Sequence, residues 1–280
     1  MDFNIILRGV ATAALIVASP AFAQEDEPLP NDPNNLTIGV GGAYVPSYEG
    51  SDDYELVPSG VIRGKVAGFG FTTRGTGISI DLIRDDPNSD YSFDLGPTAN
   101  LRLDRTRGIK DAHVRALGEI DTAIEVGAYA GFTKNKLLHR YDSLGFSVSW
   151  LHDVTNTHDS AIIIPAIQYT TPLSPKTLVQ LGVQAEHVGT GYGLTYFSVT
   201  PAGSAASGLP VYATDGGWKN YRINLFGAQM LSGDLRHPKL SLFGGVSYSR
   251  LLGDFKRSPI VAIAGDADQY FATIGLAYSF

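Results

Sequence analysis

Apolar and polar side chains alternate at every second residue in segment after segment of this chain, most clearly in the last one, YFATIGLAYSF. Successive side chains of a β-strand point to opposite faces, so this period of two predicts strands with one apolar and one polar face. Twelve segments carry the pattern: 36–45, 55–63, 65–73, 76–83, 91–104, 120–133, 142–151, 160–171, 177–188, 218–231, 239–252 and 270–280.

Such strands can close into a barrel in a membrane or stack into a soluble sandwich. An even strand count is typical of bacterial single-chain barrels, and the connections alternate between short turns and longer loops. Beyond the N-terminal segment there is no run of 18 apolar residues to form a spanning helix. We therefore expect a transmembrane antiparallel β-barrel over residues 36–280, with short periplasmic turns and longer extracellular loops. A soluble β-sandwich is the alternative.

The first 23 residues have the features of a secretory signal peptide. Arg8 supplies the positive charge, residues 9–19 are apolar but too short to span a bilayer, and residues 21–23 match the A-x-A cleavage pattern. We expect export and cleavage before Gln24. The polar, proline-rich residues 24–35 are then predicted to be a flexible lead-in to the barrel.

Composition narrows the compartment and the partners. The chain has no cysteine, so neither disulfides nor thiolate metal sites hold it together. Its net charge of −7 argues against nucleic acid as a partner. These features favour the bacterial outer membrane, where the barrel wall would contact lipid and lipopolysaccharide.

The C-terminus supports the same location. Tyr278 and Phe280 would lie in the periplasmic aromatic girdle of a barrel, where amphipathic rings are favoured. A terminal aromatic residue after alternating apolar residues also resembles the C-terminal signal that the barrel assembly machinery reads in outer-membrane proteins.

The polar face of the strands carries charges of both signs. With the apolar face toward lipid, these charges are predicted to face the lumen: Arg63, Asp81, Asp94, Arg102, Asp121, Glu125, Glu186 and Arg222. Opposed charges would either close the lumen through ion pairs or line a narrow wet path. The basic loop 105–119 would fold inward as a plug or stay exposed and contact lipopolysaccharide phosphates.

Sequence signs of catalysis are weak, and we expect no catalytic residues, cofactor or metal. Phosphate-binding, nucleophile-elbow and zinc-protease motifs are absent. Asp52 and Asp53 would be the acids of a rim hydrolase, but no sequence partner fixes their geometry. The loop LHDVTNTHDS, residues 151–160, holds two His and two Asp that would suit a divalent cation, or simply a polar extracellular surface.

Three stretches give a family resemblance. The segment GAYVPSYEGSDDYELVP, residues 42–58, resembles a recurrent stretch of the MltA-interacting protein (MipA/OmpV) family at Tyr44, Pro46, Tyr48, Gly50, Ser51, Tyr54 and Pro58. Residues 111–132 and 207–218 are similar to the same family, though more loosely.

The resemblance implies an outer-membrane barrel that is not an enzyme. One member of the family is regarded as a scaffold that joins a murein transglycosylase to a murein synthase, so it implies these two enzymes as partners. A narrow channel for small solutes is the alternative function, and a rim hydrolase is a third.

Overall fold

The structure is a computed structural model that describes residues 34–84, 86 and 89–280. The predicted signal peptide, 1–23, lies outside the described residues, and so does most of the predicted lead-in. The barrel begins at Asn35, which is one residue before the predicted boundary.

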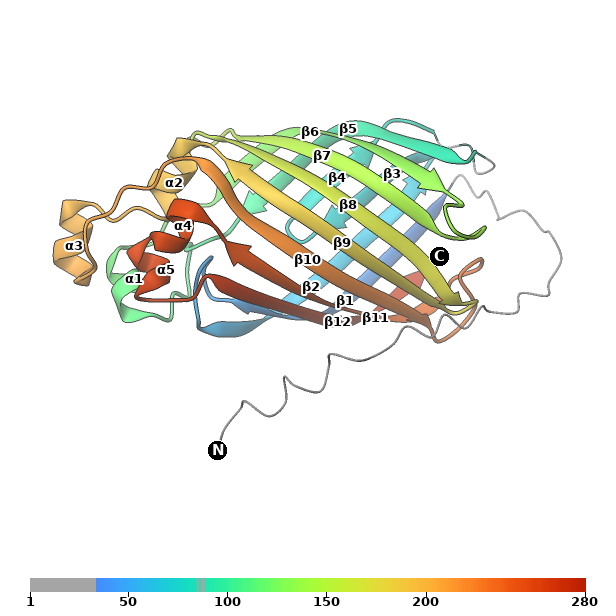
Figure 1. Cartoon of the computed structure of the whole chain (residues 1–280). Helices are drawn as coiled ribbons and strands as arrows, with labels where there is room; N and C mark the ends of the chain where they lie inside the picture. Colours follow the sequence, from blue (N-terminus) through green and yellow to red (C-terminus); the bar gives the residue numbers. More distant parts are fainter. Residues whose placement is uncertain (1–33, 85, 87–88) are drawn as a thin grey trace.

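Twelve antiparallel strands form a closed barrel, as the alternation predicts (Figure 1). Each strand pairs with its neighbours along the chain, and β12 pairs with β1 to close the wall. The strands are β1 Asn35–Pro46, β2 Tyr54–Val66, β3 Phe69–Arg74, β4 Gly77–Asp81, β5 Tyr91–Arg102, β6 Ala123–Asn135, β7 Ser143–Asp153, β8 Ala161–Ser174, β9 Thr177–Val188, β10 Gly217–Met230, β11 Leu240–Leu251 and β12 Asp268–Ser279.

The helices gather at one end of the barrel, opposite the C-terminus (Figure 1). They are α1 Ala112–Ala116, α2 Thr190–Tyr196, α3 Pro201–Ser207, α4 Gly253–Arg257 and α5 Pro259–Ala262. None of the helices in the described residues is long and apolar enough to cross a membrane. Since outer-membrane barrels have long extracellular loops and short periplasmic turns, the helical end is the extracellular end.

The apolar face of each strand points away from the barrel axis. Paired strands place like with like: Ile38 lies opposite Ile62, and Leu225 opposite Val246. These side chains are exposed, whereas inward-facing residues of the strands, such as Ser249 and Gln269, are buried in the barrel. A soluble sandwich would bury its apolar faces, so the exposed apolar belt excludes that alternative.

The register gives a direct test. Val148 lies on the outer face of β7, and Ser147 lies on the inner face. We expect Val148→Arg to lower the free energy of unfolding in lipid by about 2–4 kcal/mol, because the arginine would enter the hydrocarbon region. The control, Ser147→Arg, should cost much less. Urea titration of the refolded protein in vesicles measures both, and equal losses would contradict the register.

One predicted turn is displaced. The predicted strands 55–63 and 65–73 leave only Gly64 between them for the first periplasmic turn, but β2 continues to Val66 and the turn is made by Ala67 and Gly68. Both turn residues have positive φ angles, 52° and 84°, as a type I′ hairpin requires. The glycine in the strand interior was misread as a turn signal.

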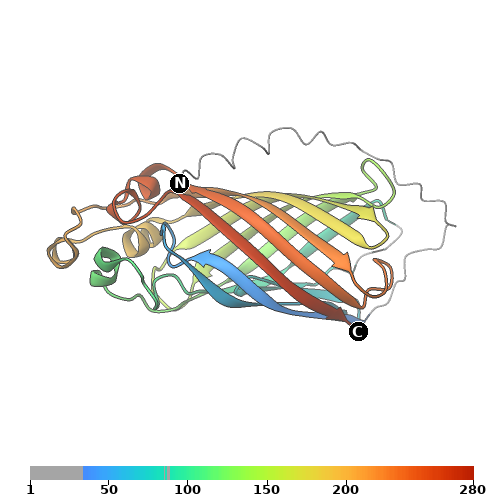
Figure 2. The same cartoon turned by 90° about the horizontal axis from the view of Figure 1, so that it is seen from below.

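The first and last strands lie side by side at the closing seam (Figure 2). The Phe280 N–H donates to the Leu36 carbonyl at 2.9 Å, and the Thr37 and Ser279 hydroxyls lie 2.8 Å apart. The Tyr278 and Phe280 rings meet edge to face, with their centroids 4.9 Å apart. The C-terminal aromatic pair therefore lies on the outer wall at the periplasmic end.

Candidate functional site

The long loops form a compact cap over the extracellular mouth. Its main apolar cluster joins wall residues to side chains of the cap: Leu151, Ile162, Val188 and Leu251 from strands, and Tyr192, Tyr196, Phe197, Phe255 and Val261 from the loops. A second cluster, made entirely by the loops, lies beyond it: Tyr48, Ile109, Val114, Val199, Leu209, Ile260 and Ala264. Burying each large apolar side chain contributes roughly 1.5–3 kcal/mol, so the cap is held firmly in the mouth.

Helix α2 brings the central aromatic residues of the cap against the wall. Gly191 allows this approach, because a Cβ at its position would lie 2.1 Å from the His158 carbonyl oxygen. The Tyr192 N–H also donates to the Ser160 hydroxyl at 3.1 Å. As a result, Tyr192 is fully buried although it belongs to a surface loop.

A buried polar cluster lies under α2 and connects the cap to the wall. The Tyr192 hydroxyl is its centre: it accepts from Arg102 Nη1 at 2.9 Å and Lys219 Nζ at 3.0 Å, and it donates to Glu49 Oε2 at 2.7 Å. Both cations also lie over the Tyr192 ring, at 4.8 and 4.6 Å from its centroid. The Tyr192 hydroxyl oxygen, on α2, therefore joins Glu49 of the first loop to Arg102 and Lys219 of the wall.

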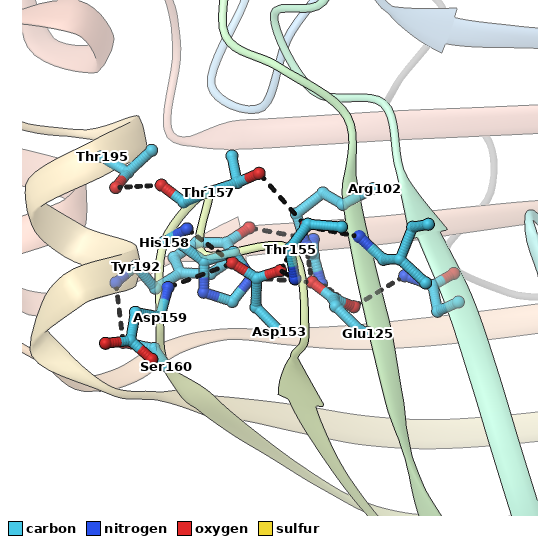
Figure 3. Close-up of polar contacts among 12 residues, drawn as sticks. Arg102, Glu125, Asp153, Thr155, Thr157, His158, Asp159, Ser160, Tyr192 and Thr195 are labelled. Carbon is cyan, nitrogen blue, oxygen red and sulfur yellow. Dashed lines mark hydrogen bonds and ion pairs between the residues drawn. The ribbon is translucent and has the colours of Figure 1, made fainter.

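The wall residues of this cluster pair with one another. Arg102 binds Glu125, with Nη2 3.2 Å from Oε2 (Figure 3). Arg102 Nη2 also lies 3.3 Å from Glu186 Oε1. Glu125 has no exposed surface and is further bonded by Asn100 Nδ2 at 2.8 Å. Lys219 Nζ lies 2.9 Å from Glu186 and 2.7 Å from Glu49. Every charge in the cluster therefore has an opposite partner, as burial requires.

Lys219 enters the cluster through a β-bulge. The pairing of β10 with β9 shifts between Trp218 and Asn220, which leaves Lys219 as the extra residue. A bulge re-aims a side chain locally, and here it places the ammonium group of Lys219 in a fully buried position. Strict alternation assigns no such position to Lys219, so the sequence pattern missed it.

The two His and two Asp of the β7–β8 loop do not converge on one point. Asp153 accepts backbone N–H bonds from Thr155 and His158, at 2.9 and 2.7 Å. His158 turns inward, with Nε2 3.2 Å from Glu125 (Figure 3). His152 Nε2 instead lies 3.6 Å from Asp159. No group of three or more His, Cys, Asp or Glu in the described part of the chain is placed to hold a metal.

The predicted lumen charges have different positions. Arg102, Glu125 and Glu186 meet in the cluster under the cap, and Arg222 lies nearby over the Phe271 ring, 4.4 Å from its centroid. Three others lie on the inner faces of their strands away from the cluster: Arg63 on β2, Asp81 on β4 and Asp94 on β5.

The assignment of Asp121 to the lumen is wrong. Strand β6 begins at Ala123, and Asp121 is exposed in the preceding connection. The sequence pattern started this strand at residue 120, since Ile120 fits the apolar period. In the structure, Ile120 instead packs against the main apolar cluster of the cap.

Loop 105–119 belongs to the cap and carries helix α1. The buried Arg105 donates to the carbonyls of Tyr196 and Gly118, both at 3.3 Å, and Lys110 donates to the Tyr54 carbonyl. Neither the plug nor the exposed-loop hypothesis describes loop 105–119 fully. The loop folds over the mouth, but the tyrosine that reaches the wall charges comes from α2.

Removing the central hydroxyl should loosen the cap. We expect Tyr192→Phe to lower the free energy of cap opening by about 1.5–3 kcal/mol, because Arg102, Lys219 and Glu49 each lose a partner. Tyr196→Phe is the control, since the buried Tyr196 hydroxyl has no hydrogen-bond partner among the described residues. Hydrogen exchange of residues 189–216 reports cap opening. Equal protection in both variants would show that the hydroxyl does not hold the cap.

Asp104 makes the seating of the first loop depend on pH. Its carboxylate accepts the Glu49 N–H at 2.7 Å, while burial and the Glu49 charge raise the pKa of Asp104 to about 6. A raised carboxyl pKa stabilises the fold below the unfolded value of 3.8, and this contribution is lost as pH rises through about 6. Hydrogen exchange of residues 46–54 should therefore be slower at pH 5 than at pH 7.5 after correction for intrinsic rates. Asp104→Asn should abolish the difference, and its persistence would contradict the assignment.

The closed wall with short turns at one end and an ordered loop cap at the other defines the class: this is a β-barrel protein of the bacterial outer membrane. The family model described as "MltA-interacting protein MipA" matches residues 38–280. The chain therefore belongs to this family, which confirms the resemblance in the sequence.

The chain is also similar to solved outer-membrane structures. An outer membrane channel from Pseudomonas putida F1 is 12% identical, with a TM-score of 0.45 over 92% of this chain and 99% of that one. OmpT of Vibrio cholerae is 11% identical, with a TM-score of 0.36 over 91% and 100%. The TodX monoaromatic hydrocarbon channel mutant is 10% identical, with a TM-score of 0.38 over 91% and 92%. The comparison with curated proteins found no match.

Proposed function

We propose that this protein is a non-conducting outer-membrane barrel that serves as a scaffold for murein-synthesising and murein-degrading enzymes on its periplasmic side. The closed extracellular mouth is the observation that carries the proposal. A channel needs a continuous wet path, whereas here Tyr192, Phe197 and Ile260 fill the mouth and have no exposed surface. The family name, MltA-interacting protein, supports a murein transglycosylase as one partner.

We also propose that the protein is not an enzyme. The charges of the buried cluster are saturated by one another, and Glu125 is bonded by Arg102, Asn100 and His158. A general acid or base must reach the proton that it transfers, and this carboxylate has no exposed surface. Asp52 and Asp53 are exposed at the rim, which is the ordinary state of loop carboxylates.

The same proposal covers how the protein is exported, how it is assembled into the outer membrane, and which lipids surround it. Residues 1–23 direct export. The C-terminal end of β12, with Tyr278 and the following Phe280, presents the assembly signal to the barrel assembly machinery. The exposed apolar belt then contacts lipid and lipopolysaccharide.

Single-channel recording in planar bilayers, combined with binding to a purified MltA-type transglycosylase and a murein synthase, tests the function. We expect the wild-type barrel to conduct poorly and to bind both enzymes. A variant with residues 190–215 replaced by a short glycine linker should open a measurable pore, which shows that the assay detects an open lumen. Steady, ion-selective conductance of the wild type, without enzyme binding, would instead favour the narrow-channel function.

A further inference from the structure

Three periplasmic turns form one continuous surface, which we call the ledge: residues 136–142, 175–176 and 231–239. The Leu235 N–H donates to the Pro175 carbonyl at 2.8 Å, which ties the β10–β11 turn to the β8–β9 turn. Arg236 Nη2 donates to the Tyr141 hydroxyl at 3.3 Å, which ties the same turn to the β6–β7 turn. Hairpin ends in a barrel have no structural need for such cross-links, since each is already closed by its own strands.

The β6–β7 turn of the ledge is ordered by one buried carboxylate. Asp142 Oδ1 accepts the N–H groups of Leu137 and His139, at 2.8 and 3.3 Å, and Oδ2 accepts that of Leu138 at 3.0 Å. The Tyr169 hydroxyl donates to Asp142 Oδ2 at 2.8 Å. A partner that binds this turn therefore does not have to order it first, which favours affinity.

The ordered turn presents two leucines to the periplasm. Leu138 is 78% exposed and Leu137 is 42% exposed. They follow a layer of ion pairs, in which Asp90 lies 3.6 Å from Lys134 and 3.0 Å from Lys136. Because this charged layer separates the leucines from the lipid-facing part of β6, the hydrocarbon of the bilayer is not what covers them.

The ledge is basic although the chain is acidic. Its three turns hold five Lys and Arg against two Asp, and the adjacent Asp90 pairs with Lys136, so the local balance is +2, whereas the whole chain carries −7. One of the two acids, Asp142, is buried. Lys176, His237 and Lys239 are exposed around the turns. Apolar side chains within a basic rim are complementary to an apolar pocket within an acidic rim.

We propose that the ledge is the docking surface for a periplasmic protein that carries an apolar pocket rimmed by carboxylates. This inference rests on the proposed function, under which the murein transglycosylase carries that pocket. Leu138 is the anchor that enters the pocket, and Lys176 and Lys239 steer the encounter. A murein glycan has no apolar pocket for a leucine, so the leucines favour a protein over the glycan itself.

The test measures binding of a purified MltA-type transglycosylase to the full barrel in nanodiscs by surface plasmon resonance. We expect Leu138→Asp to raise Kd at least tenfold. Leu194→Asp is the matched control, because Leu194 is a 51% exposed leucine in the extracellular cap. Lys239→Glu should slow association and weaken its dependence on salt, whereas Lys256→Glu on the exposed face of α4 should change neither.

If the wild type binds and the ledge variants bind equally well, the inference is wrong and the proposed function stands. If the wild type does not bind at all, the proposed function fails and the inference fails with it. Loss of binding with Lys239→Glu but not with Leu138→Asp would also overturn the leucine anchor. Heat-modifiable mobility on gels confirms folding, and Leu138→Ser provides a second, uncharged variant.

Discussion

Arg102→Met is expected to lower the free energy of unfolding by about 3–5 kcal/mol, because it leaves the fully buried Glu125 without its cation. The double variant Arg102→Met/Glu125→Gln should be more stable than the single one, since the remaining glutamine still finds Asn100 and His158 as neighbours. Equilibrium urea unfolding of the refolded barrel in vesicles measures both losses.

Arg250 offers a matched control for this prediction. It also pairs with a carboxylate, Asp268, at 2.7 Å, but both side chains are partly exposed. An exposed ion pair gains little over its hydrated groups, so Arg250→Met should change stability far less than Arg102→Met. Equal effects at the two sites, or a double variant less stable than the single one, would show that the buried cluster does not lock the cap.

Phe280→Asp is expected to remove most folded protein from the outer membrane. The substitution replaces a girdle aromatic by a charge and removes the proposed C-terminal assembly signal, and it also breaks the ring contact with Tyr278. Ser279→Asp is the control, because Ser279 faces the lumen one residue away. Heat-modifiable protein in purified outer membranes measures assembly. Wild-type amounts of the Phe280→Asp protein would contradict the role of the terminal residue.

The period of two was enough to predict the barrel, since closing a wall between lipid and lumen forces alternation on every strand. The count of twelve and most boundaries follow from it. The errors occur where a residue fits the apolar period but belongs to a loop cluster, as Ile120 does, or where a glycine lies inside a strand, as Gly64 does. Periodicity says nothing about where a loop folds back.

The site was predictable only for its strand residues. Arg102, Glu125 and Glu186 follow from alternation, but Tyr192 reaches Arg102 from a loop that has no period. Glu49 binds Tyr192 from another such loop. Lys219 points inward only because of a β-bulge. A bulge adds one residue to the strand, so simple alternation does not predict the inward position of Lys219. His158 carried a signal, a histidine among loop acids, but the signal suggested a metal rather than the buried Glu125.

The barrel and its cap close through contacts between the first and last parts of the chain: β1 pairs with β12. Glu49 meets Lys219 across 170 residues, and the Tyr48 hydroxyl reaches the Ala264 carbonyl across 216. Contacts so distant along the chain form late and slowly. Neither the wall nor the mouth can therefore form while the chain is still emerging from the export channel. The unclosed polypeptide must be held soluble across the periplasm until β12 is available to pair with β1, so any delay at that stage exposes strand edges to aggregation and proteolysis.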